Sequence, residues 1–348
     1  MVNRGAFRLI DRYGEKKYLT EYDLCVELFD RFDLKVYDII PIRKVYMVSS
    51  NKGKKIFKKL EYTLDELNFI NELLIYVRSK FPRVVNFVEN KEGYIYTIWN
   101  GDMYCIMDVV YGRECNFSNP VDLSIAAEGL GEFHLASEGF KTNIQNKYNN
   151  GKLIDTFNRR IQEMEFFRNI ANIHEKKTEF DEIFIKNSDY YIEQIKKSES
   201  MLEESYYYKL CSEEDKIVVC HHDLAYHNIL INNNEAYFVD FDYAIIDLKV
   251  HDLCNFINKV IKSFAFDTEK AKLIIDNYCN KNTLSSRELE VLYAMLNFPN
   301  DFYTISRDYY TKRKDWKEEI FLDRLKRKIR YKEDREEFLE EFKNKVLS

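Results

Sequence analysis

The spacing of hydrophobic residues changes along the chain, and these changes predict its first elements. Residues 22–29 carry apolar side chains at helical spacing. Residues 37–60 carry them in the short runs that are typical of strands, interrupted by a turn at 51–53 that ends in glycine. Because such a turn joins two strand-like runs, we predict a β-hairpin in this stretch.

A helix is predicted directly after the hairpin, over residues 63–80. Thr63 and Glu66 have the spacing of a capping box at its start, and Pro82 stops it at its end. Residues 93–99 and 103–110 again have the pattern of strands. A β-rich unit is therefore expected to end near residue 110.

The rest of the chain is predicted to be mainly helical. The helical pattern begins at 121–137 and continues, with many charged residues, up to a short strand-like segment at 217–220. Two further strand-like segments, 228–231 and 236–239, flank a turn of three asparagines and predict a second hairpin. The tail from residue 284 onward is helical again.

Composition excludes several classes of protein. Lys and Arg number 53 and Asp and Glu 59, so the net charge is −6, and no general positive field attracts nucleic acid or membranes. No apolar stretch approaches the roughly 18 residues of a membrane span. The 7 cysteines are scattered and include no Cys-x-x-Cys pair, which argues against disulfides and indicates a reducing cytoplasm. Basic residues within 312–330 are interleaved with acidic ones, as on a solvated helix face.

The most informative segment runs from His221 to Asn228 and is followed, after the second hairpin, by Asp240. Asp223 lies in the loop after the 217–220 strand, and Asn228 begins the next strand. The hairpin then returns the chain so that Asp240 arrives nearby. Each of these residues alone is a common turn or cap residue. Their joint spacing indicates one site at which three oxygen-bearing side chains converge.

These residue types suit phosphoryl transfer with a divalent cation. Asn228 and Asp240 offer the oxygen ligands that Mg²⁺ prefers while phosphate fills its open positions. Asp223 is left to orient an attacking hydroxyl. The reaction also needs a lysine on an N-terminal strand to hold the phosphates, and Lys58 on the third predicted strand is the candidate.

The pattern His-x-Asp-x-x-x-x-Asn at 221–228, with Asp240-Phe241 downstream, resembles the protein-kinase-like fold of the aminoglycoside phosphotransferase and choline kinase group. Within this group the chain is most similar to the CotS-type spore coat proteins. The similarity is carried by Gly112-Arg113-Glu114-Cys115 and by the segments 219–228 and 239–244, and it extends over about residues 20–320.

The resemblance implies a bilobal α+β fold and assigns roles to residues. A small β-rich lobe would occupy residues 1–108, and a larger, mainly helical lobe would occupy 109–348, with the catalytic loop and hairpin at 217–242. Asp223 would be the catalytic aspartate, Asn228 and Asp240 the metal ligands, Lys58 the phosphate-binding lysine and His221 a support for the loop.

Nucleotide contacts follow from the same resemblance. Met107, Asp108 and Val109 fall where such folds connect their lobes and offer backbone groups to adenine. The helix partner of Lys58 is Glu66 or Glu72, since helical spacing permits either, and we prefer Glu66.

The chain also departs from the protein-kinase pattern. No Gly-x-Gly-x-x-Gly loop precedes Lys58, because the corresponding turn reads Pro41-Ile42-Arg43-Lys44-Val45. Asp242 replaces the glycine of the Asp-Phe-Gly signature. These departures make a small-molecule kinase the nearer analogy, and protein acceptors stay open.

Histidines and a second aspartate near the site are predicted to be structural. His134 is expected to be a hydrogen-bonded core histidine of a helix. His222 and His227, like His221, lack a matching Cys or His set for zinc. Helix capping is the default role for Asp247 and Asp252, and the resemblance favours Asp252 as a brace of the catalytic loop.

Two functions are carried forward. The first is a spore coat-associated phosphotransferase that uses ATP or GTP with Mg²⁺ to phosphorylate a hydroxyl-bearing acceptor. The second is a non-catalytic component of spore coat assembly that keeps the fold. Other spore coat proteins are further expected partners, whereas nucleic acid and a membrane span are not expected. The expected location is the mother-cell cytoplasm, with assembly into the spore coat.

Overall fold

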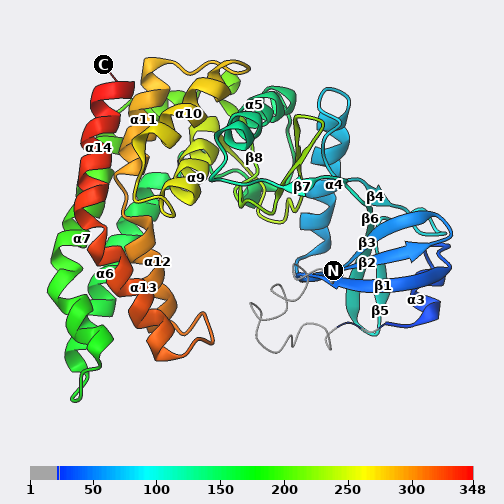
Figure 1. Ribbon diagram of the computed structural model, residues 1–348, viewed down its shortest axis with the longest axis horizontal. Coiled ribbons are helices and arrows are strands. Elements are labelled where there is room, and N and C mark those ends of the chain that lie inside the picture. The colour runs from blue at the N-terminus through cyan, green and yellow to red at the C-terminus, as the bar shows by residue number, and fades with distance from the viewer. Residues whose placement is uncertain (1–21, 23, 348) are drawn as a thin grey trace, which may run out of the picture. The chain divides into compact units, whose positions relative to one another are not determined.

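The computed structural model describes residue 22 and residues 24–347, and it forms two compact units (Figure 1). The first comprises the described residues up to Ile75 together with Val84–Tyr111. The second comprises Tyr76–Arg83 and the chain from Gly112 onward. The helix that connects them therefore contributes residues to both units.

In its described residues, the N-terminal unit consists of an antiparallel sheet and two helices. Its strand order is β1-β2-β3-β6-β4, and β5 pairs with β6. The predicted opening helix, first hairpin and following helix are confirmed. The strands are β1 (Val36–Ile42), β2 (Val45–Ser50), β3 (Gly53–Leu60), β4 (Phe87–Val88), β5 (Thr97–Trp99) and β6 (Asp102–Asp108), and the helices are α3 (Val26–Asp30) and α4 (Leu64–Arg78).

Buried aromatic residues hold β3 and β6 together. Phe57 and Tyr104 are fully buried, and their rings stack with centroids 5.2 Å apart. Phe57 lies on β3 directly before Lys58, so burial of its ring sends the Lys58 side chain to the opposite face of the sheet. This alternation fixes which face of the strand carries the lysine.

One predicted strand is shorter than expected. Only residues 97–99 of the 93–99 segment form β5. The Asn90 side-chain oxygen accepts hydrogen bonds from the backbone N–H groups of Glu92 and Tyr94, at 2.9 and 3.0 Å. These bonds fold the preceding residues into a turn, which is a local alternative to a strand.

The C-terminal unit is mainly helical and contains two small sheets, one in the order β10-β9-β7 and one that pairs β11 with β8. The strands are β7 (Arg113–Glu114), β8 (Ile217–Cys220), β9 (Ile229–Asn232), β10 (Glu235–Phe238) and β11 (Ile245–Leu248). The α-helices are α5 (Pro120–Ser137), α6 (Leu153–Ile173), α7 (Glu179–Glu204), α8 (Tyr207–Cys211), α9 (Lys249–Ile261), α10 (Thr268–Cys279), α11 (Ser286–Leu296), α12 (Asn300–Tyr310), α13 (Glu318–Arg330) and α14 (Lys332–Val346).

The predicted second hairpin is formed by an asparagine turn and is positioned by close packing against helix α5. Asn233 and Asn234 have φ of 49° and 59°, a left-handed conformation that asparagine tolerates, and they join β9 to β10. Helix α5 packs against β10 at Gly129, where an added Cβ would lie 2.7 Å from the Cβ of Ala236. Only glycine permits this approach between helix and strand.

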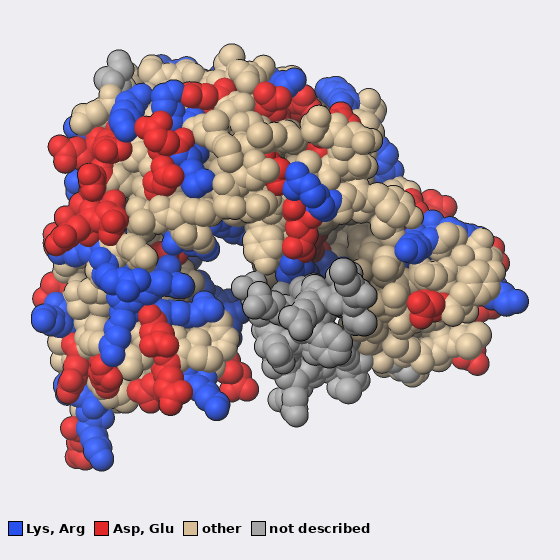
Figure 2. Space-filling view, in the orientation of Figure 1, with Lys and Arg blue, Asp and Glu red and all other residues tan. Residues whose placement is uncertain are grey.

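Charged side chains of both signs cover the visible face of the C-terminal unit (Figure 2), and Lys and Arg gather over the region of α12 and α13. Within the 312–330 stretch, Lys326 pairs with Glu179 and Lys328 with Asp301, in keeping with the mixed signs of its sequence. No helix in the described part of the chain has the length and apolarity needed to cross a membrane.

Candidate functional site

The loop between β8 and β9 brings Asp223 and Asn228 into direct contact. The Asn228 side-chain amide donates hydrogen bonds to the Oδ2 atom and to the backbone oxygen of Asp223, both at 2.9 Å. Asn228 is buried, whereas the Asp223 side chain keeps 27% of its surface exposed. A rigid amide therefore orients a carboxylate that solvent can still reach.

The Asp223 carboxylate also forms an ion pair with a lysine that the sequence did not point to. Lys259 lies near the end of α9, and its ammonium donates to Asp223 Oδ1 in an ion pair. Lys259 follows Asp252 by seven residues, and this spacing of two helical turns puts both on one face of α9. Because Asp252 was expected to brace the catalytic loop, this spacing is the signal by which Lys259 could have been identified from the sequence.

The Asp252 side chain supports the loop between β8 and β9 through hydrogen bonds. Its Oδ2 and Oδ1 atoms accept the backbone N–H groups of His221 and His222, at 2.5 and 2.8 Å. The bracing role is thus confirmed, and the default capping role is wrong: the cap residue of α9 is Leu248, which makes no side-chain cap bond. Asp247 instead accepts from Asn149 and is bound to His251.

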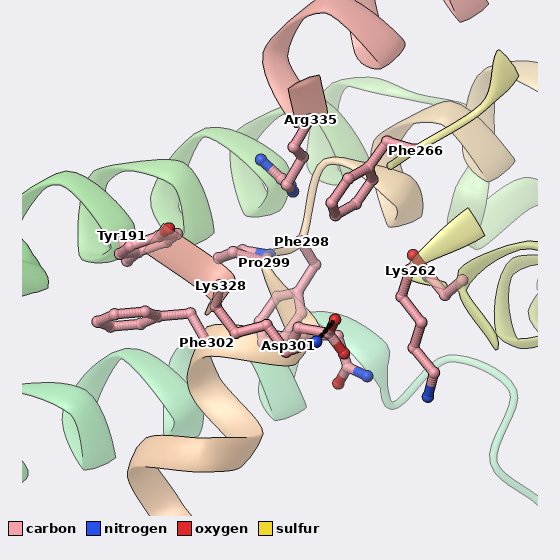
Figure 3. A pocket seen from close by; sticks show the side chains of 11 residues that line it. Tyr191, Lys262, Phe266, Phe298, Pro299, Asp301, Phe302, Lys328 and Arg335 are labelled. Atoms are coloured by element: carbon pink, nitrogen blue, oxygen red, sulfur yellow. Dashed lines mark hydrogen bonds and ion pairs between the residues drawn. The ribbon is translucent and has the colours of Figure 1, made fainter. Parts of the chain in front are cut away.

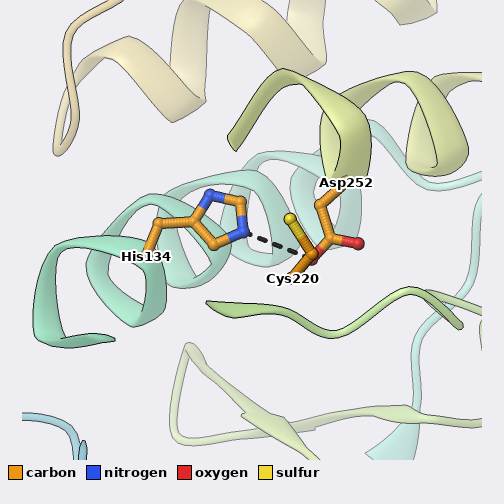
Figure 4. A group of neighbouring side chains, drawn as sticks. All are labelled: His134, Cys220 and Asp252. Atoms are coloured by element: carbon orange, nitrogen blue, oxygen red, sulfur yellow. Dashed lines mark hydrogen bonds and ion pairs between the residues drawn. The ribbon is translucent and has the colours of Figure 1, made fainter. Parts of the chain in front are cut away.

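The Asp252 carboxylate is fully buried and belongs to a cluster with His134 and Cys220 (Figure 4). His134 Nε2 lies 3.2 Å from Asp252 Oδ2, and its Nδ1 lies 2.9 Å from the Tyr278 hydroxyl. Burial would raise the pKa of Asp252, but hydrogen bonds from His134 and the loop N–H groups outweigh it and lower this pKa. His134 is thus confirmed as a hydrogen-bonded core residue.

This cluster has metal-ligand residue types but not the chemistry of a metal site. Burial raises the pKa of the Cys220 thiol well above its usual value, and its Sγ lies 3.4 Å from the Leu248 carbonyl. A metal would require the thiolate. Both ring nitrogens of His134 are already engaged. Hydrogen bonding therefore accounts for the group without a cation.

Asp240 follows β10 in a backbone conformation that is unusual for aspartate. Its φ is 67°, in the left-handed region. The preceding residue, Val239, is fixed twice: its N–H donates to the Asn228 carbonyl and its carbonyl lies against His221 Nε2, each at 3.0 Å. The backbone just before Asp240 is therefore bound to Asn228 and His221, whereas the convergence of its carboxylate with Asp223 and Asn228 stays a prediction.

The donor set at this point fits a hard divalent cation. The Asn228 amide nitrogen is used on Asp223, so Oδ1 is the atom of this side chain that could hold a cation. The carboxylate of Asp240, the residue after Val239, is the other predicted ligand. Oxygen ligands of this kind suit Mg²⁺.

The residues predicted to contact nucleotide lie in the N-terminal unit. Lys58 is half-buried on β3, opposite Cys105 of β6. The Glu66 carboxylate accepts from the Thr63 backbone N–H at 3.1 Å, and the Glu66 N–H donates to the Thr63 hydroxyl. The capping box is thus confirmed. Pairing of Lys58 with Glu66 stays a prediction, as does the alternative, the exposed Glu72.

Met107 and Asp108 end β6, and Val109 follows the strand. The Asp108 carboxylate accepts from Lys55 Nζ at 2.7 Å and from the Asn86 amide at 2.9 Å. Its side chain therefore secures the end of the strand. The Asp108 N–H also donates to the Asn86 carbonyl at 2.9 Å, and Met107 pairs with residues of both β3 and β4. Contact between residues 107–109 and a nucleotide base stays a prediction.

We expect the titration of His222 to destabilise the fold as pH falls from 7.5 to 5, against the opposite contribution of His251, whose pKa is raised by Asp247 despite its burial. Burial, and next the adjacent His251, lower the pKa of His222 to about 4, below its unfolded value near 6.5. A depressed histidine pKa stabilises the fold above the unfolded value and ceases to do so as pH falls toward the folded one. The loss by pH 5 is about 2 kcal/mol.

Urea unfolding at the two pH values measures this loss. His222→Asn removes the titration and keeps a residue that tolerates the φ of 65° at this position. The variant should lose about 2 kcal/mol less than the parent between the two pH values. Equal losses in both proteins would contradict the assignment to His222.

The fold is that of protein-kinase-like phosphotransferases. An aminoglycoside phosphotransferase from Alicyclobacillus acidocaldarius has a TM-score of 0.81 to this structure, with 18% identity over 93% of this chain and 96% of that chain. A spectinomycin phosphotransferase in complex with ADP and spectinomycin has a TM-score of 0.64, with 16% identity over 91% and 96% of the two chains. The predicted α+β protein-kinase-like fold is thereby confirmed.

The chain belongs to the family described as "Spore coat putative kinase YutH", whose model matches residues 26–342. It is also 24% identical to "Spore coat protein S" of Bacillus subtilis (strain 168) over 303 residues, which cover 86% of each chain. The predicted resemblance to spore coat proteins of the aminoglycoside phosphotransferase group is confirmed.

Proposed function

We propose that this chain is a nucleotide-dependent phosphotransferase that uses Mg²⁺ and phosphorylates a hydroxyl group. The observation that carries the proposal is the Asp223 carboxylate, oriented by Asn228, tied to Lys259 and still open to solvent. An aspartate with a purely structural role would be expected to lie buried among its partners. Asp223 instead lies on a braced loop with its carboxylate accessible to solvent.

Each residue has a role in this reaction. Asp223 orients the acceptor hydroxyl and takes its proton as the oxygen attacks phosphorus. The Lys259 ammonium offsets negative charge that develops on the transferring group. Lys58 would hold the nucleotide phosphates, and the backbone of residues 107–109 would contact the base. Mg²⁺, held by Asn228 Oδ1 and Asp240, would neutralise phosphate charge when bound.

We expect ATP or GTP with Mg²⁺ to raise the midpoint of thermal unfolding, because a ligand that binds only the folded state stabilises it. At about 100 times the dissociation constant the gain is about 2.7 kcal/mol. Asp240→Asn should lose most of this gain, since it removes a charged ligand of the metal. Differential scanning fluorimetry with and without Mg²⁺ measures both effects.

Asp276→Asn is a matched control, because Asp276 lies on the exposed face of α10 in an i,i+4 pair with Lys272. It removes the same charge far from the loop and should respond like the parent. If millimolar nucleotide with Mg²⁺ leaves the parent unchanged, the non-catalytic coat component becomes the better account of this chain.

The relatives support a proposal for the biological setting. The curated relative is a spore coat protein, which supports a role for this chain in or around the coat. We therefore propose synthesis in the mother cell and association with other coat components. The acceptor would be encountered there.

A further inference from the structure

A small pocket in the C-terminal unit, beside the end of α9, has no part in the transfer chemistry described above. Its volume is about 30 Å³, whereas a cavity that holds one water needs about 10–15 Å³. The pocket thus admits a compact group of atoms rather than a whole sugar or nucleotide. Figure 3 shows the side chains that surround it, which include Tyr191, Lys262, Asp301, Lys328 and Arg335.

Positive charge exceeds negative charge around this pocket. Lys328 and Asp301 pair with each other. Lys262 is exposed at the pocket, and its ammonium makes no hydrogen bond or ion pair with any described residue. Arg335 Nη2 donates to the backbone carbonyls of residues 296 and 297, which are neutral. Beside the paired Lys328 and Asp301, the lining therefore carries two further cations and no further carboxylate among the described residues.

The Arg335 guanidinium also has an unmet hydrogen bond. Its Nη1 atom is buried and has no hydrogen-bond partner in the part of the chain that the structure describes. Buried donors are nearly always partnered, and an unpaired buried charge is costly. Burial lowers the pKa of Arg335, yet a guanidinium stays protonated in proteins. An oxyanion in the pocket would supply the missing acceptor.

Two further features favour an anion. Tyr191 is 3% exposed, and burial raises its pKa to about 12, so its hydroxyl stays protonated and can donate. Helix α12 begins at the pocket, and its cap residue, Pro299, makes no side-chain cap bond. The start of this 11-residue helix brings the positive end of the helix dipole to the pocket, with Asp301 in its first turn and the Asn300 N–H donating to the Phe298 carbonyl at 2.8 Å.

Helix α9 and its cap residue contribute both to the pocket, through Lys262, and to the ion pair with Asp223, through Lys259. Lys262 continues the helical conformation of α9 as its C-terminal cap residue. It follows Lys259 by three residues, which is a rise of about 4.5 Å on the same face of the helix. Lys259 is bound to Asp223. A small molecule with an anionic group in the pocket would then extend along this face of α9 toward Asp223.

We propose that this pocket binds a phosphate or carboxylate group of the acceptor, so that the substrate is an anionic hydroxyl compound. The statement about the acceptor rests on the proposed phosphotransferase function, whereas anion binding by the pocket does not. The two can therefore be tested separately.

Inorganic phosphate is the probe, and isothermal titration calorimetry with thermal unfolding is the measurement. The full chain should bind phosphate at concentrations up to about 10 mM, where a millimolar site is largely filled. Potassium chloride keeps ionic strength constant. Lys262→Gln and Tyr191→Phe should each weaken binding by about tenfold, because each removes one donor to the anion.

Lys186→Gln is the matched control: Lys186 is an exposed lysine of α7 that does not line the pocket, and its loss changes the net charge equally. It should bind phosphate like the parent. Tyr191→Phe keeps the ring that stacks on Phe302 at 3.6 Å between centroids, so the packing is retained. Absence of phosphate and acetate binding in the parent, or parental binding in both pocket variants, would overturn the proposal.

Separate arms distinguish the ligand and the site. Acetate replaces phosphate in a second titration, and binding of acetate alone assigns a carboxylate whereas binding of phosphate alone assigns a phosphoryl group. Asp240→Asn should keep phosphate binding while losing nucleotide binding. If it loses both, phosphate was occupying the nucleotide site and the pocket assignment is wrong. A parent that binds phosphate but no nucleotide would refute the phosphotransferase and leave the anion site standing.

Discussion

Asp223→Asn is expected to lower the rate of phosphate release from ATP by about 10²–10⁴-fold, the usual contribution of a positioned general base. The assay uses water as the acceptor, so it does not require the natural substrate. The amide retains the size of the carboxylate but can neither take a proton nor pair with Lys259. Nucleotide binding should be nearly unchanged, because Asp223 is not among the proposed metal ligands.

The comparison of two readouts makes this result specific. Thermal unfolding with nucleotide and Mg²⁺ reports binding, and phosphate release reports the chemical step. Asp276→Asn, on the exposed face of α10, should match the parent in both. An Asp223→Asn protein that hydrolyses ATP at the parental rate would remove Asp223 from the catalytic role.

Asp252→Asn is expected to have the largest effect on stability, a loss of about 2–5 kcal/mol. Its two carboxylate oxygens accept the backbone N–H groups of His221 and His222 and the ring of His134. An amide would point an NH₂ group at one of these donors and leave it unsatisfied in a fully buried place. Urea unfolding at pH 7.5 measures the change.

A milder variant covers the case in which Asp252→Asn does not fold. Tyr278→Phe removes only the hydroxyl that contacts His134 Nδ1. It should cost about 1 kcal/mol, as for one hydrogen bond. Exposed substitutions such as Asp276→Asn should stay within about 0.5 kcal/mol. If Asp252→Asn also stayed within that range, the carboxylate would not be the support of the loop.

Local signals in the sequence predicted most elements that position the site. The Asn51-Lys52-Gly53 turn placed Lys58 on β3, the Thr63–Glu66 box placed the start of α4, and the asparagine turn placed the β9–β10 hairpin. Each depends on residues within a few positions of one another. Such interactions are encoded by short-range geometry, and a single sequence is enough to identify them.

Contacts between distant segments were not predictable in the same way. β8 pairs with β11, which begins 25 residues after β8 ends, and the strand pattern alone does not select that partner. The Lys259–Asp223 ion pair depends on how α9 packs beneath the loop. His134 was expected to be hydrogen-bonded in the core, yet its partner Tyr278 lies 144 residues away. Tertiary packing decides these contacts.

The support of the catalytic loop also has a consequence for how this part of the molecule opens. Loops usually fray independently of the helices around them. Here the backbone of His221 and His222 is tied through Asp252 and His134 to α9, α5 and α10. Exposing these amides to solvent requires those helices to separate. The loop that carries Asp223 thus belongs to the same cooperative unfolding unit as the core of the C-terminal unit.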